Sequence, residues 1–263
     1  MKNILVTGAG GGMGSATCRL LIEKGYNVWG LDRRQKDNID RLHFIQTDIT
    51  DEAAVSAAFE QIAGQTDRLD AVIHMAGLYD LNSLIEMSEQ EFINIFNVNL
   101  FGVYRINRIF MPLIKDGSRI IITSSELAPL DPLPFTGIYA VTKAALEKYA
   151  FSLRMELNLL GVSVSVIRPG AVKTDLLSVS TRALDSFCKK TQLYQCNAER
   201  FKKIVDSVEA KNIPAQSIAK IAYKAMTARR PKYVYSVNRN PLLRLLNILP
   251  DRMQVAIIKM ILK

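Results

Sequence analysis

The chain has 263 residues, of which 49% are hydrophobic. It is long and apolar enough for one globular domain with a sizeable core, which excludes an intrinsically disordered protein. Three cysteines without a CxxC pair and only two histidines exclude a disulfide framework and a histidine-rich metal cluster, so no metal site is expected. The net charge is +9, but eight basic residues and one acid lie within 229–263, so this is not the uniform basic field of a nucleic-acid-binding protein.

The first stretch combines a strand, a glycine-rich turn and a helix. Residues 3–7 predict a short buried strand, the turn is GAGGGMG at 8–14, and the spacing of apolar residues predicts a helix over 15–26. This order brings a diphosphate to a helix N-terminus, because small residues let the backbone approach and the free amides face the anion. Since the chain opens directly on a strand, we expect no export signal and a cytoplasmic protein.

The second predicted strand, 27–32, ends at Asp32. A carboxylate about 20 residues beyond the glycine turn suits the ribose hydroxyls of NAD and repels the 2′-phosphate of NADP. Arg33 and Arg34 follow at once, and an arginine there favours a 2′-phosphate. The sequence therefore favours NAD, with NADP as the alternative.

Strands and helices go on alternating beyond Asp32. Further strands are predicted at 41–50, 69–77, 118–126 and 162–174, and helices at 51–64, 88–114 and 134–154. Six alternations predict an α/β fold with a doubly wound parallel sheet of Rossmann-type topology, in which ligands lie at the C-terminal strand ends. His74 stands at one such end. We expect it to pack or hydrogen-bond within the sheet, with a direct cofactor contact as the alternative.

Tyr139 and Lys143 lie one helical turn apart on the same face of the predicted helix 134–154. A fixed ammonium favours the phenolate, so the pair can make Tyr139 a general acid/base near neutral pH. A surface tyrosine and lysine on an amphipathic helix is the alternative for this spacing alone.

The last part of the chain divides into three. Residues 175–213 are polar and predict a mobile lid over a substrate, and a helix at 214–228 and a strand at 232–237 follow. We assign 1–240 to the main domain and 241–263 to a basic tail of two amphipathic helices broken at Pro250. Its apolar stripes, Leu242, Leu245, Leu246, Leu249 and Met253, Ala256, Ile257, Met260, either touch an anionic membrane surface or cover the protein itself or a subunit interface.

Several motifs stand in the order of one family, and the chain resembles the short-chain dehydrogenases/reductases over residues 3–237. Thr7-Gly8, Gly12 and Gly14 fit the family's TGxxxGxG loop. Asn99, Ser125, Tyr139 and Lys143 fit its catalytic tetrad. The resemblance implies contacts with the dinucleotide by Thr7, Gly8, Gly12, Met13, Gly14, Asp32, Arg33, Asp48, Ile49, Ala76, Gly77, Tyr139, Lys143, Pro169, Gly170, Val172 and Thr174.

The chain departs from the family pattern in three places. HMAG at 74–77 replaces NNAG, and His74 is the candidate to brace that turn instead. The glycine loop also fits the GxxGxxG pattern of the longer epimerase-like branch, although the chain is short for that branch. The spacing from Ser125 to Tyr139 is one residue longer than usual, which leaves Ser124 as an alternative.

The resemblance implies a mechanism. Tyr139 exchanges the proton of the substrate hydroxyl, and Lys143 lowers its pKa and binds the nicotinamide ribose. Ser125 hydrogen-bonds the reacting oxygen, and Asn99 supports a water path to the lysine. These roles need a donor and a cation in place where a carbonyl becomes an alkoxide.

The substrate is expected to be a hydrophobic secondary alcohol or ketone, such as a steroid, retinoid or acyl chain. The expected pocket residues are mostly apolar: Leu127, Leu133, Pro134, Phe135 and parts of 175–210. A homodimer or homotetramer is expected, and no nucleic-acid partner. A catalytically idle redox sensor and a nucleotide-sugar epimerase are the alternative functions.

Overall fold

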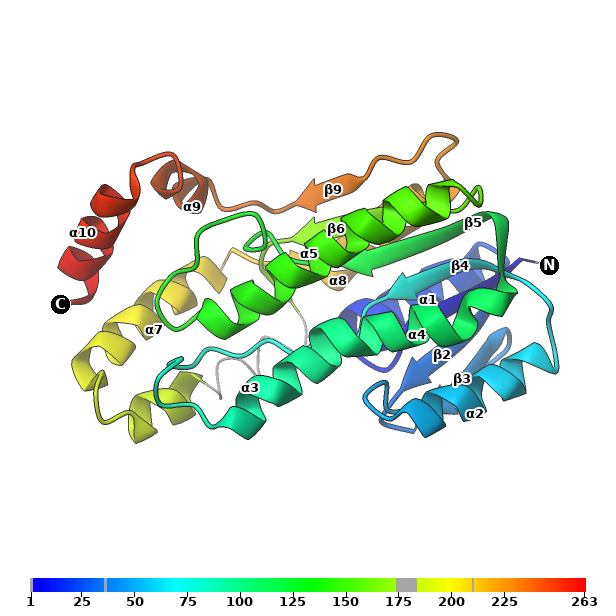
Figure 1. Ribbon diagram of the computed structural model, residues 1–263, viewed down its shortest axis with the longest axis horizontal. Coiled ribbons are helices and arrows are strands. Elements are labelled where there is room, and N and C mark those ends of the chain that lie inside the picture. Colours follow the sequence, from blue (N-terminus) through cyan, green and yellow to red (C-terminus); the bar gives the residue numbers. More distant parts are fainter. Residues whose placement is uncertain (1, 36, 174–183, 210) are drawn as a thin grey trace.

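The computed structural model describes residues 2–35, 37–173, 184–209 and 211–263. Its centre is a sheet of seven parallel strands in the order β3-β2-β1-β4-β5-β6-β9 (Figure 1). The strands are β1 (Asn3–Thr7), β2 (Asn27–Asp32), β3 (Leu42–Gln46), β4 (Leu69–His74), β5 (Ile114–Thr123), β6 (Ser163–Pro169) and β9 (Val234–Val237). The winding direction reverses between β1 and β4, where such sheets bind their ligands. The predicted doubly wound parallel sheet is therefore confirmed.

Helices cover both faces of this sheet (Figure 1). They are α1 (Gly12–Glu23) and α8 (Ala215–Thr227) on one face, and α2 (Glu52–Ala63), α4 (Gly102–Phe110) and α5 (Gly137–Asn158) on the other. The division follows from the alternation of side chains along a strand. In β1, Leu5 packs toward α2, α4 and α5, whereas Ile4 and Val6 pack toward α1 and α8.

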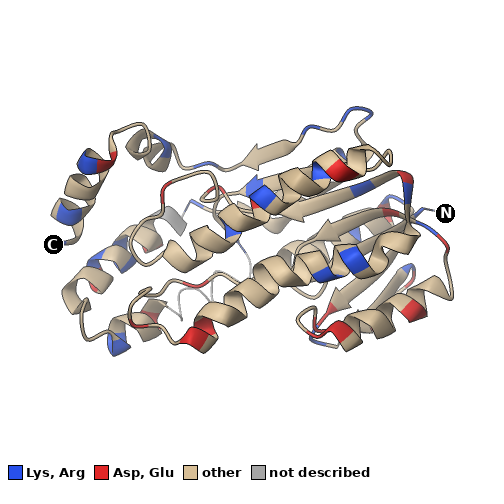
Figure 2. Cartoon of the chain, in the orientation of Figure 1, with Lys and Arg blue, Asp and Glu red and all other residues tan. Residues whose placement is uncertain are grey.

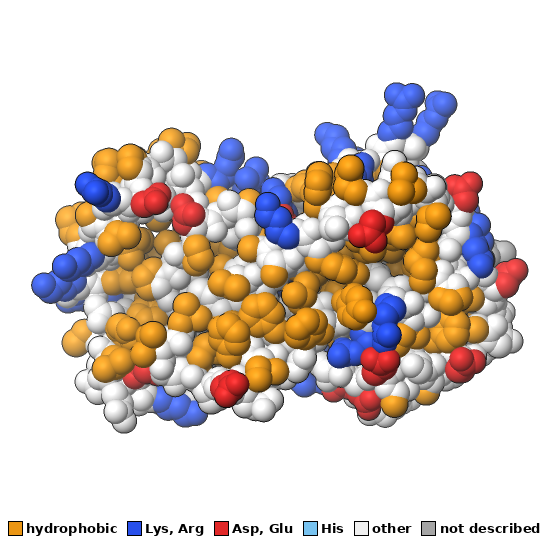
Figure 3. Space-filling view, viewed as in Figure 1, with side chains coloured by type: hydrophobic (Ala, Val, Ile, Leu, Met, Phe, Trp, Pro, Cys, Tyr) orange, Lys and Arg blue, Asp and Glu red, His pale blue; other side chains and the backbone are white. Residues whose placement is uncertain are grey.

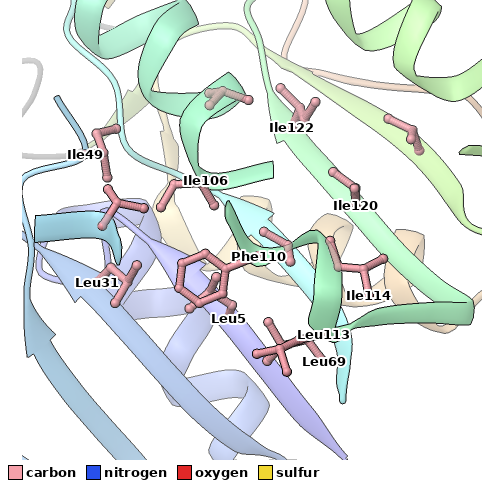
Figure 4. Packing of buried hydrophobic residues seen from close by; sticks show 14 of the residues in the cluster. Leu5, Leu31, Ile49, Leu69, Ile106, Phe110, Leu113, Ile114, Ile120 and Ile122 are labelled. Carbon is pink, nitrogen blue, oxygen red and sulfur yellow. The ribbon is translucent and has the colours of Figure 1, made fainter. Parts of the chain in front are cut away.

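The core on the α4 face is closely filled (Figure 4). Ile106 and Phe110 of α4 meet Leu5 and Leu31 of the sheet, and all four side chains are fully buried. Burial of one such side chain is worth about 1.5–3 kcal/mol. The packing fixes the strands on which the site residues stand.

The long helix predicted over 88–114 is interrupted, so that prediction was wrong in part. Helix α3 (Glu89–Phe96) begins with a capping box, in which Ser88 and Glu91 hydrogen-bond each other's backbone amides. A π-helical turn, η1 (Asn97–Phe101), separates α3 from α4, and a short 3₁₀ turn, η2 (Met111–Leu113), ends the run before β5. A π turn of this kind marks functional sites, and this one carries Asn99.

The segment predicted as a poorly patterned lid is largely helical where the structure describes it. Residues 184–190 are helical and α7 (Gln195–Glu209) follows, while 174–183 lie outside the described residues. Strands β7 (Val172–Lys173) and β8 (Ile213–Pro214) pair at the base of the segment. The segment has a small apolar core of its own, in which Phe135 meets Phe187 and Phe201.

The C-terminal tail forms α9 (Pro241–Leu246) and α10 (Asp251–Leu262), so the predicted break at Pro250 is confirmed. Ile258 and Leu262 pack into the core beside α7, and Asn197 of α7 donates a hydrogen bond to the carbonyl of Leu262. Much of the two predicted apolar stripes is exposed instead of packed: Leu242, Leu245, Met253 and Met260 are 50–76% exposed. Among the described residues, no helix is long and apolar enough to cross a membrane.

Candidate functional site

The glycine turn is held at the C-terminal end of β1 by two contacts that only glycine allows. Gly8 has a φ of 67°, and a Cβ there would lie 2.6 Å from the amide nitrogen of Ala76. A Cβ on Gly14 would lie 2.0 Å from the carbonyl oxygen of Gly8. The first turn of α1, with Gly12 and Met13, is thereby pressed against the strand end. This is a cradle of backbone amides at a helix N-terminus, as a diphosphate requires.

Asp32 lies beside this cradle, at the end of β2. Its carboxylate is 9% exposed and accepts hydrogen bonds from the amides of Gly10 and Arg34, both at 3.0 Å. The Arg34 guanidinium lies 3.7 Å from the same carboxylate and donates to the Gly10 carbonyl at 3.3 Å, while Arg33 is exposed. The negative charge that we predicted to select the nucleotide is therefore at the loop, with one arginine partly neutralising it.

Asp48 and Ile49 follow β3 at the same edge of the sheet. Asp48 is exposed, and its Oδ1 accepts from the amide and hydroxyl of Thr50. Ile49 is buried, and its carbonyl accepts a 2.7 Å hydrogen bond from Arg105. Both residues stand where the resemblance places the adenine end of a dinucleotide.

The turn at Ala76-Gly77 is braced by Asn99, and His74 has no part in it. Asn99 Oδ1 accepts from the Leu78 amide at 2.8 Å, and its Nδ2 donates to the Leu78 carbonyl and to Thr142 Oγ1, both at 3.0 Å. His74 instead hydrogen-bonds Asn107 at 2.8 Å, and burial lowers its pKa to about 4. The idea that His74 substitutes for the missing asparagine was therefore wrong, because its hydrogen-bond partner is Asn107 of α4. The expectation that His74 packs or hydrogen-bonds is confirmed.

Tyr139, Lys143 and Ser125 meet at the ends of β5 and α5. Lys143 is 4% exposed, and its Nζ donates to the Thr123 carbonyl at 3.1 Å. The same Nζ lies 5.7 Å from the centre of the Tyr139 ring. Tyr139 hydrogen-bonds Ser125, whereas Ser124 Oγ is buried with no partner among the described residues. Of the two serines, only Ser125 joins the tyrosine.

Burial sets the protonation of this pair. It raises the pKa of Tyr139 to about 12, against the lowering effect of the Ser125 hydrogen bond, and the nearby Glu126 charge raises it further. Burial also lowers the pKa of Lys143 to about 8, although Glu147 raises it. The expected lowering of the tyrosine pKa by Lys143 is not seen, because the ammonium faces the ring and the Thr123 carbonyl. At neutral pH Tyr139 is a neutral phenol, which is a proton donor.

The strand end at Pro169-Gly170 closes the site from the β6 side. A Cβ on Gly170 would lie 1.9 Å from the carbonyl oxygen of Asn238, so the two loops touch there. Val172 is buried in β7. Thr174, the last residue that the resemblance placed at the cofactor, lies outside the described residues.

One mostly apolar pocket lies between Tyr139, Lys143 and Ser125 and the strand ends at Gly77 and Gly170. Its walls include the site residues Met13, Ala76, Gly77, Ser125, Tyr139, Lys143, Pro169, Gly170 and Val172, with the apolar side chains Leu78, Leu127, Leu133, Phe201, Ile204, Val205 and Leu243. Leu127 and Leu133 line it as expected. Pro134 and Phe135 do not line this pocket. Phe135 belongs to the small apolar core that contains Phe187 and Phe201, and Pro134 lines a separate groove.

Sequence reasoning missed several wall residues, among them Tyr79, Glu126 and Leu243. The Tyr79 ring lies 4.7 Å from that of Tyr139. Leu243 comes from the tail, and no sequence signal placed that helix at the pocket. Glu126 could have been noticed, because it follows Ser125 directly. The described residues contain no group of three or more metal-binding side chains.

The described residues fit a dinucleotide. The glycine cradle would accept the diphosphate and Asp32 lies beside it, where it could meet a ribose, while Lys143 borders the pocket next to Gly77.

Comparisons with known proteins agree with this geometry. The family model of the short chain dehydrogenases matches residues 2–185. The 3-ketodihydrosphingosine reductase of Bacteroides thetaiotaomicron is 27% identical over 95% of this chain and 94% of its own, and the NADPH-dependent 3-dehydrocapnine reductase of Ornithobacterium rhinotracheale is 27% identical over 96% and 94%. A short chain dehydrogenase family protein from Francisella tularensis has the same fold, with a TM-score of 0.76 at 20% identity over 90% of this chain and 97% of its own.

Proposed function

The chain belongs to the short chain dehydrogenase family, and we propose that it reduces a hydrophobic ketone to the secondary alcohol, with Tyr139 as the proton donor. As a family member it is an NAD(P)-dependent oxidoreductase that interconverts alcohols and ketones. The observation that carries the finer proposal is the apolar pocket with Tyr139, Ser125 and Lys143 on one wall.

Each side chain of the site has its own role in the proposed reduction. Ser125 holds the carbonyl oxygen next to Tyr139, and the phenol gives its proton to that oxygen as charge develops on it. Lys143 supplies a buried positive charge below the tyrosine ring, and Asn99 fixes the turn at Leu78 that forms the adjoining wall. The bound dinucleotide supplies the hydride at its nicotinamide C4. A neutral phenol is the form that donates this proton, and the relatives from Bacteroides and Ornithobacterium are named reductases, which supports ketone reduction.

The test is oxidation of the reduced cofactor in the presence of an apolar ketone such as dodecan-3-one. We expect turnover with this ketone and much weaker turnover with acetone, because acetone leaves the apolar walls at Leu127 and Phe201 exposed to water. Equal turnover of the two ketones would contradict a hydrophobic substrate.

For the cofactor we propose NAD, on the strength of the Asp32 charge at the loop. The relative from Ornithobacterium is named NADPH-dependent, so the preference needs its own experiment. In Asp32→Asn an oxygen remains to accept from Gly10, but the charge is gone. We expect affinity for NADPH to rise by at least about tenfold, because a like charge beside the 2′-phosphate costs several kcal/mol. Titrations of wild type and Asp32→Asn with NADH and NADPH measure this change in affinity.

The matched control is Arg34→Gln, which removes the cation that faces Asp32. It should weaken NADPH binding and leave NADH binding nearly unchanged. If wild type already binds NADPH more tightly than NADH, Asp32 does not set the preference and the choice of NAD is wrong.

For the tail we propose a peripheral contact with an anionic membrane surface. Leu242 and Leu245 of α9, and Ile248 in the turn that follows it, are 60–78% exposed. Basic side chains accompany them, while Asp251 is the one acid (Figure 2). Apolar groups among cations suit the boundary between headgroups and acyl chains. Leu243 of the same helix lines the pocket, so a substrate dissolved in the membrane would have a short way to it.

Sedimentation with vesicles of phosphatidylcholine and phosphatidylglycerol tests the tail. Leu245→Asp with Ile248→Asp should lower the bound fraction by at least about tenfold, because each side chain contributes about 1.5–3 kcal/mol when buried. Ile39→Asp, which changes a 55% exposed side chain outside the tail, is the control. Equal sedimentation of all three proteins would refute the membrane contact.

We also propose that the chain forms a homodimer or homotetramer. Figure 3 shows hydrophobic side chains gathered over the face that carries α4 and α5. Phe101, Tyr104, Phe151 and Met155 on this face are 46–62% exposed. A second copy of the chain would cover them, and oligomers are common in this family. Light scattering should therefore give a mass of two or four chains of 29.4 kDa, and a stable monomer would contradict the proposal.

A further inference from the structure

Glu126 is a buried carboxylate in the wall of an otherwise apolar pocket. It follows Ser125 at the end of β5, is 7% exposed, and lines the same cavity as Tyr139. Its charge is close enough to Tyr139 to raise the tyrosine pKa. The proposed reaction gives it no role, since Ser125, Tyr139 and Lys143 already handle the reacting oxygen and its proton.

The hydrogen bonds of Glu126 account for one side-chain oxygen. Oε2 accepts from the Asn240 amide at 2.6 Å, and the Glu126 amide donates to the Pro169 carbonyl at 2.9 Å. Oε1 lies on the Gly170 side, 2.9 Å from where a Cβ on that glycine would be. This leaves Oε1 as the oxygen that a ligand can use.

No lysine or arginine in the described parts of the chain forms a close ion pair with this carboxylate. None of the ion pairs formed by their lysines and arginines, at 4.0 Å or less, includes Glu126. Burial has the largest effect on the pKa of Glu126 and raises it. The hydrogen bond from the Asn240 amide lowers this pKa, and the charge of Arg239 lowers it least. Lys143 lines the same pocket, but the carboxylate that raises its pKa is Glu147. A buried carboxylate without a cation is costly, and a cationic ligand removes that cost.

A purely structural role does not explain the charge. Holding the Asn240 amide fixes the entry to α9, but the oxygen of a neutral glutamine would accept the same hydrogen bond. A carboxylate in this place is therefore better explained by something that arrives from the pocket.

We propose that Glu126 binds an ammonium group of the substrate, carried on the carbon next to the reacting carbonyl or on the one after it. Ser125 and Glu126 are consecutive residues that line the same pocket, so a substrate that fills it can reach both side chains. The substrate class is then an amino ketone with an apolar chain, and the chain lies along Leu133, Phe201 and Leu243. This proposal rests on the ketone reduction proposed above and narrows its substrate.

The test compares two ketones that differ in the amine alone, 2-aminododecan-3-one and dodecan-3-one, with wild type and Glu126→Gln. Wild type should prefer the amino ketone in kcat/KM. Glu126→Gln keeps the acceptor for Asn240 and should lower kcat/KM for the amino ketone by at least about 30-fold, the lower end of the loss when one partner of a buried charge pair is neutralised. The ratio of kcat/KM for the amino ketone to kcat/KM for dodecan-3-one should fall by a similar factor, because only the amino ketone carries an ammonium group.

Three outcomes overturn the proposal. They are a wild type that prefers the plain ketone or does not reduce the amino ketone, a Glu126→Gln variant that loses both ketones equally, and a variant whose loss lies in the KM of the cofactor. Equal loss with a lowered melting temperature would show a structural latch only. Failure of the ketone reductase function itself shows differently: wild type would then reduce neither ketone.

Discussion

Tyr139→Phe should lower the rate of ketone reduction by about 10²–10⁴-fold, the usual contribution of a positioned general acid, and leave cofactor binding nearly unchanged. The phenylalanine ring keeps the T-shaped contact with Tyr79 and the position above Lys143, so the pocket wall is preserved. Only the hydroxyl is lost, and with it the hydrogen bond to Ser125 and the proton. Steady-state kinetics and a titration with NADH measure the two effects separately.

Tyr149→Phe is the matched control, because it makes the same change ten residues further along α5. The Tyr149 hydroxyl accepts a hydrogen bond from Asn107 at 3.1 Å and does not line the pocket. That variant should keep its activity and lose only a little stability. If Tyr139→Phe also loses cofactor binding, or if the two variants behave alike, Tyr139 is not the proton donor.

Gly14→Ala should abolish cofactor binding and destabilise the protein by about 1–3 kcal/mol or more, the cost of forcing atoms into a packed site. The added Cβ would lie 2.0 Å from the Gly8 carbonyl oxygen and 3.0 Å from the Ala9 Cα. Both are backbone atoms, which cannot rotate away as a side chain can. Helix α1 must then move off the end of β1, which opens the diphosphate cradle. Thermal unfolding and NADH titration would show the two effects.

Gly11→Ala controls for the general effect of adding a methyl group to this loop. Its nearest atom, the Gly8 carbonyl oxygen, would be 3.4 Å from the new Cβ, the border of ordinary contact. We expect this variant to fold and to keep most of its cofactor affinity. A Gly14→Ala protein that binds NADH as wild type does would show that the cradle does not hold the diphosphate.

The strands were predictable because each is a short apolar run that ends at a small or polar residue. NVWGLD at 27–32 was placed to the residue, since its side chains are buried on both faces as a central parallel strand requires. The meeting of Asp32, Ser125 and Tyr139 followed from the same logic, because parallel strands end at one edge of the sheet.

Local pattern could not show what tertiary contacts decide. Nothing in the apolar spacing of 88–114 predicts the π turn at η1, where Asn99 bonds the backbone of Leu78, a residue 21 positions earlier. His74 was given a bracing role that its side chain, turned toward Asn107, does not serve. The tyrosine pKa likewise depends on how deeply the ring is buried, which the spacing of Tyr139 and Lys143 does not reveal.

In the C-terminal tail, the sequence predicted the helices but not which of their apolar residues are covered. Its amphipathic stripes were visible in the sequence, but the residues that pack on the protein are Ile258 and Leu262, while Met253 and Met260 of the predicted stripe stay exposed. A helical period shows that a face is apolar without showing which neighbour covers it. For the same reason the sequence did not place Leu243 at the pocket.

The most direct test of the central claim follows the hydride. Purified protein is given dodecan-3-one and NADH in which both hydrogens at nicotinamide C4 are deuterium, and the product is examined by mass spectrometry and NMR. We predict dodecan-3-ol with deuterium on the carbinol carbon from wild type and almost none from Tyr139→Phe. An alcohol without deuterium, or the same yield of labelled alcohol from both proteins, would contradict hydride transfer assisted by Tyr139.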